Sequence, residues 1–307
     1  MSSSSAPFAR PFLKWAGGKS QLLAQIDQYL PEAIKDGSIQ RYVEPFIGSG
    51  ALFFHVVKSY PVQELYIADF NRELVDAYWT IQQCVEDLIA VLGDMQARYT
   101  PLSEIERKAF FYEKREQFNA NRTEPPAGAL QRADVERTAQ LIFLNRTCYN
   151  GLYRVNAKGQ FNVPFGRYKR PTICDAANLR AVAAVLQRTE IHFGHYTECE
   201  EFVDTDTMVY FDPPYRPISA TARFTAYSQY SFDDKEQSEL AEFYRKLDAK
   251  GATLLLSNSD PKNVNPGDDF FEDTYAGFHI ERVQARRRIN SQAERRGPIY
   301  ELLIFNY

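Results

Sequence analysis

The sequence predicts an α/β fold in which a long helical insertion interrupts an alternating series of strands and helices. Three observations support this prediction. Residues 41–59 read as a strand, a glycine turn and a helix, residues 64–68 form a second strand that ends at Asp69, and the alternation returns after a helical stretch between about Arg72 and Pro171. Two strands joined through a helix make a parallel unit, whose ligands are expected at the carboxyl ends of its strands.

Each expected element follows from hydrophobic periodicity and from its bounding turn residues. Before the insertion we expect a disordered Ser-rich tail over residues 1–10, an apolar-to-glycine segment over 12–19, a strand over 41–46, a helix over 51–59, a strand over 64–68 and a helix from about Asn71. Within it, helical windows cover 104–119 and 134–145, with a loop at 123–128. After it, we expect helices over 178–187 and 233–247 and strands over 190–194, 208–211, 252–257, 279–286 and 300–305.

Composition excludes several classes of protein. The 307 residues are 44% hydrophobic and 25% charged, which is typical of a globular chain and excludes fibrous and wholly disordered classes. No apolar run approaches the roughly 20 residues of a membrane-spanning helix, and the N-terminus lacks the pattern of a signal peptide. The four cysteines are far apart in sequence, so we expect reduced thiols, a cytoplasmic location and no membrane partner.

The net charge of −4 hides two local excesses of basic residues. Between residues 141 and 170 there are six Lys and Arg and no acid, and between 282 and 296 there are six Arg against Glu294 alone. Each run could be a solvated surface face. Aromatic and amide residues are interspersed in the first run, which favours nucleic acid, because cations bind phosphates while planar and amide groups meet bases.

The tetrapeptide Asp212-Pro213-Pro214-Tyr215 directly follows an apolar strand. Two prolines cannot continue a strand, so the chain must turn outward, which places a carboxylate, a carbonyl and an aromatic ring together at the mouth of the sheet. Such a corner suits an adenine amino group: hydrogen bonds to Asp212 and to the Pro213 carbonyl raise its nucleophilicity toward a sulfonium methyl, and Tyr215 stacks on the flipped-out base. A plain surface turn is the alternative.

The glycine turn and Asp69 predict a nucleoside-containing ligand. Backbone at Gly48 and Gly50 can approach a ligand closely, and Asp69 stands where an acid binds ribose hydroxyls in dinucleotide folds. Phe53 replaces the third glycine of the pyrophosphate signature, which favours adenosine without pyrophosphate. Gly17-Gly18-Lys19-Ser20 has a poor match to a phosphate loop. Lys19 could instead bind a carboxylate, and Trp15 either an adenine face or the core.

These residues resemble one family, the Dam-type DNA adenine N6-methyltransferases. The matching stretches occur in order along nearly the whole chain: Phe12-Leu13-Lys14-Trp15-Ala16-Gly17-Gly18-Lys19, residues 43–50, Asp69-Phe70-Asn71, residues 144–166, Asp212 to Tyr215 and residues 219–227. Each motif is modest, but their order and spacing are specific. The resemblance implies a Rossmann-like seven-stranded sheet, with a catalytic domain of residues 11–71 and 172–307 and a target-recognition domain of residues 72–171.

The resemblance also implies S-adenosylmethionine as methyl donor and duplex DNA as substrate, and DNA contacts of this asymmetry are compatible with a monomer. No metal is expected, because the sequence shows no metal-ligand cluster. It places Trp15, Lys19, Glu44, Pro45, Phe46, Gly48, Gly50, Asp69 and Asp212 at the cofactor. In the branch that reads GATC, the loop that matches residues 149–164 enters the DNA. Carried over, Tyr149 and Asn150 begin that loop and Tyr149 wedges at the vacated base, Leu152 and Pro164 touch the thymine methyl, Arg154 reads a guanine, Lys14 contacts the first base pair, and Asn162 and Arg167 bind phosphates.

Two departures from the family pattern leave alternatives open. Thr147-Cys148 and His195-Tyr196 replace other pairs, and His195 could line the adenine pocket or be a hydrogen-bonded core histidine. Two other functions share parts of this pattern: methylation of an amine in RNA or of a protein glutamine, and sequence-specific DNA binding by a relative that has lost catalysis. The acid-free basic loop argues against a protein substrate, and the intact Asp212 tetrapeptide argues against lost catalysis.

Overall fold

A computed structural model describes residues 8–15, 17–120, 132–216, 232–285 and 299–307, and all structural statements below refer to these residues. Seven strands form one mixed sheet in the order β3-β2-β1-β4-β5-β7-β6. The strands are β1 (Arg41–Glu44), β2 (Glu64–Asp69), β3 (Thr189–Phe193), β4 (Thr207–Phe211), β5 (Thr253–Ser259), β6 (His279–Ala285) and β7 (Ile299–Phe305). The first five in the order are parallel, and β7 runs antiparallel to β5 and β6. The predicted α/β class is confirmed.

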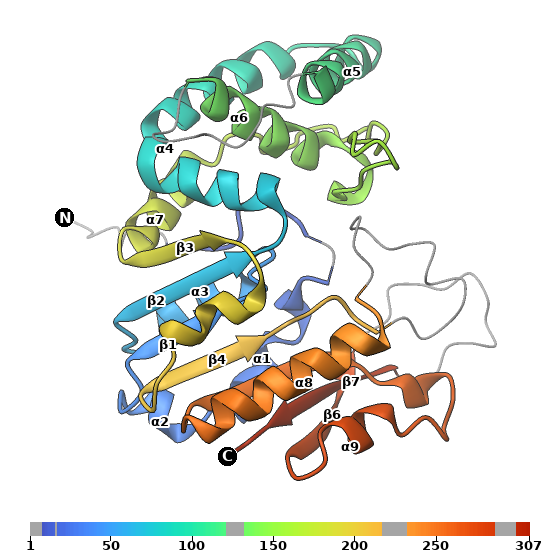
Figure 1. The fold of residues 1–307 in the computed structure, drawn as a ribbon. Helices are drawn as coiled ribbons and strands as arrows, with labels where there is room; N and C mark the ends of the chain where they lie inside the picture. The colour runs from blue at the N-terminus through green and yellow to red at the C-terminus, as the bar shows by residue number, and fades with distance from the viewer. Residues whose placement is uncertain (1–7, 16, 121–131, 217–231, 286–298) are drawn as a thin grey trace.

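Helices cover both faces of the sheet (Figure 1). They are α1 (Leu23–Ile26), α2 (Glu32–Lys35), α3 (Ala51–Ser59), α4 (Arg72–Tyr99), α5 (Glu104–Ala120), α6 (Arg132–Thr147), α7 (Ala176–Leu186), α8 (Asp234–Ala249) and α9 (Phe270–Thr274). Side chains alternate between the faces along each strand. Tyr42, Leu65 and Tyr210 pack with α1 and α3 on one face. Val43 and Phe211 pack with α8 on the other face.

A helical layer formed by α4, α5 and α6 lies beyond the β3 edge of the sheet (Figure 1). Its first helix, α4, begins after Asn71, whose side chain accepts a hydrogen bond from the Leu74 amide. Early turns of α4 pack on β2 and β3, and a break in helical geometry at Cys84 precedes the part that extends along the layer. A buried contact between Thr80 and Thr138, whose Oγ1 atoms lie 3.0 Å apart, ties α4 to α6.

The predicted tail of residues 1–10 lies partly outside the described residues. Arg10, its last residue, is hydrogen-bonded through its backbone N–H to Asn178 Oδ1 at 3.0 Å. The predicted loop at 123–128 also lies outside them. No helix in the described part of the chain is long and apolar enough to cross a membrane.

The strand order reverses between β1 and β4, which are neighbours in the sheet. The chain leaves β1 through α3 toward β2 on one side, and it leaves β4 through α8 toward β5 on the other side. Their carboxyl ends are therefore followed by loops that diverge, which leaves room between them for a ligand. The glycine turn after β1 and the Asp212 corner after β4 meet at this point.

Candidate active site

Asp212 directly follows β4, as the sequence predicts, and the turn behind it is held from two sides. The Gln237 side chain, buried in α8, donates from Nε2 to the Pro214 carbonyl at 3.1 Å. Asn258 of β5 donates to Gln237 Oε1 at 3.2 Å and accepts from the Arg216 amide, also at 3.2 Å. Both prolines also fix the backbone. The corner is therefore a rigid support for the carboxylate.

Two donors hold one oxygen of the Asp212 carboxylate. Lys19 Nζ lies 2.6 Å from Oδ1, and Ser257 Oγ donates to the same atom at 3.1 Å, itself 2.8 Å from the Tyr210 hydroxyl. Within the described residues both partners of Asp212 use Oδ1, so Oδ2 can accept a hydrogen bond from a substrate. Burial raises the pKa of Asp212, while Lys19 and Ser257 act in the opposite direction.

A second carboxylate, Glu301 of β7, completes the surroundings of Lys19. The Lys19 ammonium is 4% exposed and lies 3.9 Å from Glu301 Oε2 and 4.3 Å from the centroid of the Tyr215 ring. The Tyr215 hydroxyl donates to that Glu301 oxygen. Burial raises the pKa of Glu301. Two carboxylates against one cation favour a ligand that brings positive charge to this pocket.

Sequence reasoning missed Glu301. The signal was present, because Glu301 is a lone acid in the otherwise uncharged strand Ile299–Phe305. An acid at that position in an inner strand needs a partner, since burial of an unpaired charge is costly. The partners, Lys19 and Tyr215, lie more than 80 residues away in sequence, as the separation of 86 between Tyr215 and Glu301 shows. Only the fold brings them together.

The glycine turn is anchored to the end of β2 through Asp69. The Gly48 amide donates to Asp69 Oδ2 at 3.1 Å, and the Asn71 amide donates to Oδ1 at 2.8 Å. Gly48 and Gly50 adopt φ values of 48° and 69°, a region that favours glycine. A Cβ at Gly50 would lie 3.0 Å from the Tyr78 hydroxyl, so the turn has no space for a side chain there. Burial raises the pKa of Asp69 to about 6.

The three residues before the turn have different surroundings. Glu44 is 2% exposed and accepts a hydrogen bond from the Tyr42 hydroxyl at 2.7 Å, and burial raises its pKa well above the usual range. Pro45 is buried, and the Phe46 ring packs against Tyr196 at a centroid distance of 5.3 Å. These residues form the base of the turn, so their predicted contact with a cofactor remains a prediction.

Trp15 lies between the glycine turn and the helical layer. A Cβ at Gly48 would lie 3.3 Å from Trp15 Cδ1, and the indole stacks on Tyr153 with centroids 5.0 Å apart and planes at 18°. The ring is half-buried. Neither of the two expected roles, adenine contact or core packing, describes this position fully, since the ring bridges two parts of the molecule.

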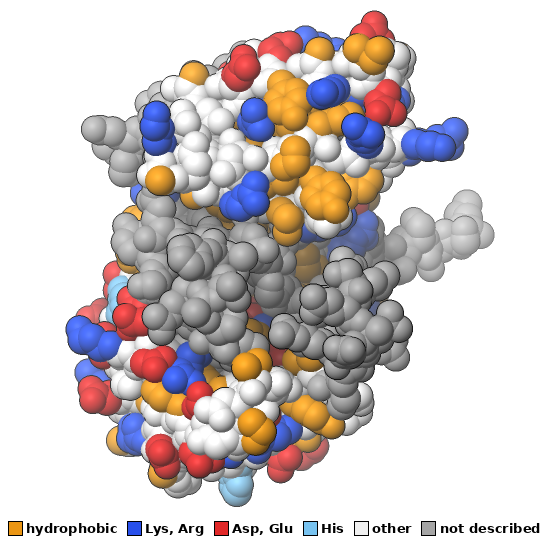
Figure 2. All heavy atoms as spheres, turned by 90° about the vertical axis from the view of Figure 1, so that its right-hand side faces the viewer, with side chains coloured by type: hydrophobic (Ala, Val, Ile, Leu, Met, Phe, Trp, Pro, Cys, Tyr) orange, Lys and Arg blue, Asp and Glu red, His pale blue; other side chains and the backbone are white. Residues whose placement is uncertain are grey.

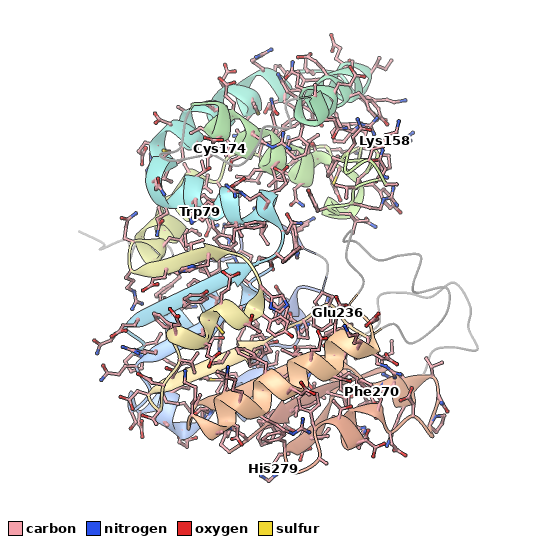
Figure 3. The ribbon with its side chains drawn as sticks, in the orientation of Figure 1. Trp79, Lys158, Cys174, Glu236, Phe270 and His279 are labelled. Atoms are coloured by element: carbon pink, nitrogen blue, oxygen red, sulfur yellow. The ribbon has the colours of Figure 1, made fainter. Side chains whose placement is uncertain are left out.

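The residues predicted to contact DNA gather in and beside the loop that follows α6, on the side of the molecule to which the parallel strands point (Figures 1 and 3). Bridges between Cys148 and Phe165 and between Val155 and Phe161 fold the loop back on itself. Lys14, Tyr149, Asn150, Arg154, Pro164 and Arg167 are exposed, and Leu152 and Asn162 are half-buried. The loop and Lys14 therefore form a surface on which polar and apolar side chains are both accessible.

Contacts within this loop and with neighbouring segments restrain some of these side chains. Arg154 Nε donates to Asn162 Oδ1 at 2.7 Å, Arg167 Nε lies 3.7 Å from Glu104 Oε1, and Lys14 Nζ lies 5.5 Å from the Tyr168 ring centroid. On the face shown in Figure 2, lysine and arginine side chains lie around hydrophobic ones over the helical layer. This arrangement suits a partner with phosphates and stacked bases.

The second basic run and His195 have other surroundings. Arg282 is paired with Asp260 at 2.9 Å and with Glu272 at 2.5 Å, and the five later arginines of the run lie outside the described residues. His195 is exposed, and its Nδ1 lies 2.8 Å from Thr197 Oγ1. Its interpretation as a core histidine is therefore wrong, because it precedes a short helical turn at the surface.

No group of three or more His, Cys, Asp or Glu side chains in the described ranges could hold a metal ion. The site consists instead of two carboxylates, one ammonium group, a glycine turn and an aromatic ring.

Comparisons with known proteins agree with this chemistry. The family model of the D12 class N6 adenine-specific DNA methyltransferases matches residues 15–289. The chain is 47% identical over 299 residues to the type II methyltransferase M.MjaIII of Methanocaldococcus jannaschii, with 97% of this chain and 99% of the relative covered. It is 35% identical over 300 residues to the type II methyltransferase M1.LlaDCHI of Lactococcus lactis, covering 97% and 95%. It is 33% identical over 294 residues to the DNA adenine methylase of Escherichia coli K12, covering 96% and 94%.

Proposed function

Because this chain belongs to the D12 class of N6 adenine-specific DNA methyltransferases, we propose that it methylates the adenine of duplex GATC at the Asp212 corner and reads that site with the loop of residues 149–167. The observation that supports the catalytic assignment most directly is the Asp212 carboxylate, whose Oδ1 is held by Lys19 and Ser257 while Oδ2 can accept from a substrate.

The target amine would be bound and oriented by the rigid corner. An exocyclic adenine amine has two N–H donors, which Asp212 Oδ2 and the Pro213 carbonyl would accept, while the Tyr215 ring stacks on the extruded base. Accepting both hydrogens increases electron density on the nitrogen. Stacking, at roughly 1–3 kcal/mol per base, offsets much of the cost of extrusion. The proton that the methylated nitrogen loses needs no strong base, because that nitrogen is acidic.

S-Adenosylmethionine, the methyl donor that the family implies, supplies an electrophilic methyl group on a positively charged sulfur. The described residues fit such a ligand. Gly48 and Gly50 supply the positive φ values of the turn beside the site, the Asp69 carboxylate can accept from ribose hydroxyls, and Lys19 can bind the methionine carboxylate. The excess negative charge of Asp212 and Glu301 complements the sulfonium. Metal-independent catalysis is part of the proposal.

The recognition part of the proposal divides residues by role. Residues 72–171 are assigned as the target-recognition domain, and residues 11–71 and 172–307 as the catalytic domain. Exposed Arg154 would donate hydrogen bonds to a guanine, and Leu152 and Pro164 would contact the thymine methyl group, as the geometry of the base edges favours. Tyr149, 56% exposed, is available as the wedge, and Lys14 for the first base pair. Asn150, which follows Tyr149 and adopts a φ of 58°, is also assigned to the DNA contact. The protein acts as a monomer on duplex DNA in the cytoplasm and is encoded by a bacterium or a phage.

The test is to incubate the purified protein with labelled S-adenosylmethionine and plasmid DNA and to map modified adenines by sequencing. Methylation confined to GATC is expected. Methylation at another site would refute the GATC assignment alone. Transfer only to RNA or to glutamine, or sequence-specific binding without transfer, would refute the proposed substrate or the proposed catalysis.

Cofactor affinity should depend on pH through Asp69. Burial raises the pKa of Asp69 to about 6, and ribose hydroxyls bind best to the ionised form. Below this pH, binding must be accompanied by loss of a proton, so affinity should fall by up to about tenfold per pH unit between pH 6 and 5. It should be nearly constant between pH 7 and 8. Calorimetric titration across this range tests the prediction. Asp69→Asn should bind more weakly and without this pH dependence, and an equal dependence in that variant would assign the titration to another group.

A further inference from the structure

Asn145, near the end of α6, makes three hydrogen bonds with one buried side chain. Its Oδ1 accepts from the Lys14 amide, and its Nδ2 donates to the Lys14 and Gly151 carbonyls, each at 2.9 Å. The residue is 1% exposed. All donors of the side-chain amide are thereby used. One side chain thus joins the segment before the cofactor site to the loop that follows α6.

The two joined backbones lie in close contact. Gly151 adopts a φ of 65°, and a Cβ at that position would lie 2.4 Å from Lys14 Cδ. Arg146, next to Asn145, donates to the Phe12 carbonyl at 2.8 Å and adds a bond to the same segment. A displacement of residues 12–15 must therefore move the start of the loop or break these contacts.

Trp15 extends this connection toward the cofactor side. It follows Lys14 directly, stacks on Tyr153 at 5.0 Å and reaches the backbone of Gly48 in the glycine turn. Two contacts, the Asn145 amide and the Trp15–Tyr153 stack, thus join the Lys14-Trp15 segment to the loop, and Trp15 lies against the glycine turn. Groups connected in this way carry energetic coupling when a ligand on one side favours one arrangement.

We propose that Asn145 is a positioning residue that couples cofactor binding to DNA reading. The stack of Trp15 on Tyr153 provides a second connection between the same two segments. Both act by fixing Lys14 and Trp15 against the loop, and neither needs to touch cofactor or base. The inference rests on the proposed function, since it assumes a cofactor at the glycine turn and DNA at the loop.

The chain offers a matched control in Asn178. This residue, also 1% exposed, pairs with Arg10 in the same reciprocal way: Oδ1 accepts from the Arg10 amide and Nδ2 donates to its carbonyl, both at 3.0 Å. The hydrogen bonds of the Asn178 side-chain amide reach Arg10, four residues before Lys14, and within the described residues they do not reach the loop. Asn178→Ala therefore removes a similar bond pair from the same segment without removing the connection.

The experiment measures binding of a fluorescent duplex that contains the mapped methylation site, by anisotropy, with and without saturating S-adenosylhomocysteine. We expect the unmodified protein to bind this duplex about tenfold more tightly with the ligand present. In Asn145→Ala the ratio should fall to about twofold or less, and in Asn178→Ala it should stay near tenfold. Melting temperatures monitor whether both variants fold.

Should Asn145→Ala fail to fold, Tyr153→Leu and Tyr153→Phe provide the second pair. The first removes the stacked ring and should lower the ratio, whereas the second keeps the ring and should preserve it. The inference is overturned if Asn145→Ala and Asn178→Ala show equal ratios, if Tyr153→Leu behaves like Tyr153→Phe, or if the unmodified protein shows no coupling. Failure of the proposed function differs from all of these, because the unmodified protein would then not distinguish the mapped duplex from a scrambled one.

Discussion

Asp212→Ala is expected to lower kcat for adenine methylation by about a thousandfold while the affinity for duplex DNA changes by less than about threefold. The variant removes the acceptor that orients the amine, whose position decides the rate of an in-line transfer. DNA affinity should survive because the exposed basic side chains of the loop lie in another part of the fold. Single-turnover kinetics with labelled cofactor, together with anisotropy binding, separate the two quantities.

Asp204→Ala is the control for this experiment. Asp204 lies just before β4, at the opposite end from Asp212, where it accepts from Arg41 at 2.7 Å and from Thr207 at 2.8 Å. Its removal should lower thermal stability slightly and leave kcat within about twofold. Full turnover in Asp212→Ala would remove the catalytic role from that carboxylate, and a comparable loss in Asp204→Ala would show that the effect is structural.

Arg154→Ala should reduce discrimination at one base pair of the target by about fivefold to a hundredfold. A bidentate contact to guanine is worth about 1–3 kcal/mol, and each 1.4 kcal/mol is about a factor of ten. Discrimination at the other positions should remain, since Leu152 and Pro164 are unchanged. The measurement is kcat/KM over a panel of duplexes that each carry one changed base pair.

Arg167→Ala provides the comparison, because Arg167 is also exposed and is assigned to a phosphate. Its loss should weaken binding to all duplexes alike and lower the slope of log affinity against log salt by about one unit. If the two variants had the same profile across the panel, the division into base-reading and phosphate-binding residues would be incorrect.

Local patterns were sufficient to predict the frame of the fold. The alternation of apolar residues predicted the position of β1, β2 and β4 to within about two residues. The two prolines after Asp212 predicted the outward turn, because their backbone chemistry permits little else. Short helices such as α1, α2 and α9 were missed, since four or five residues are too few to show helical periodicity.

The candidate site was predictable where its residues follow a strand and not where distant segments meet. Asp69 and Asp212 could be placed at the carboxyl edge of the sheet from their positions alone. Glu301 and Asn145 could not, because their partners are determined by antiparallel pairing of β7 and by packing of α6 against residues 12–14. The charge of Glu301 and the amide of Asn145 become informative only once these elements are packed.

The helical layer is an elongated crossover between two adjacent parallel strands, because the chain leaves β2 before α4 and returns through α7 to β3. Strands β1 and β4, which precede the glycine turn and Asp212, lie outside this crossover. If residues 72–171 read the target as proposed, exchange of this one continuous segment would change target preference and leave β1 and β4 intact. A viable chimera would have to keep the amide at position 145 and the glycine at position 151 compatible with Lys14, and the surface of α4 compatible with α7, β2 and β3.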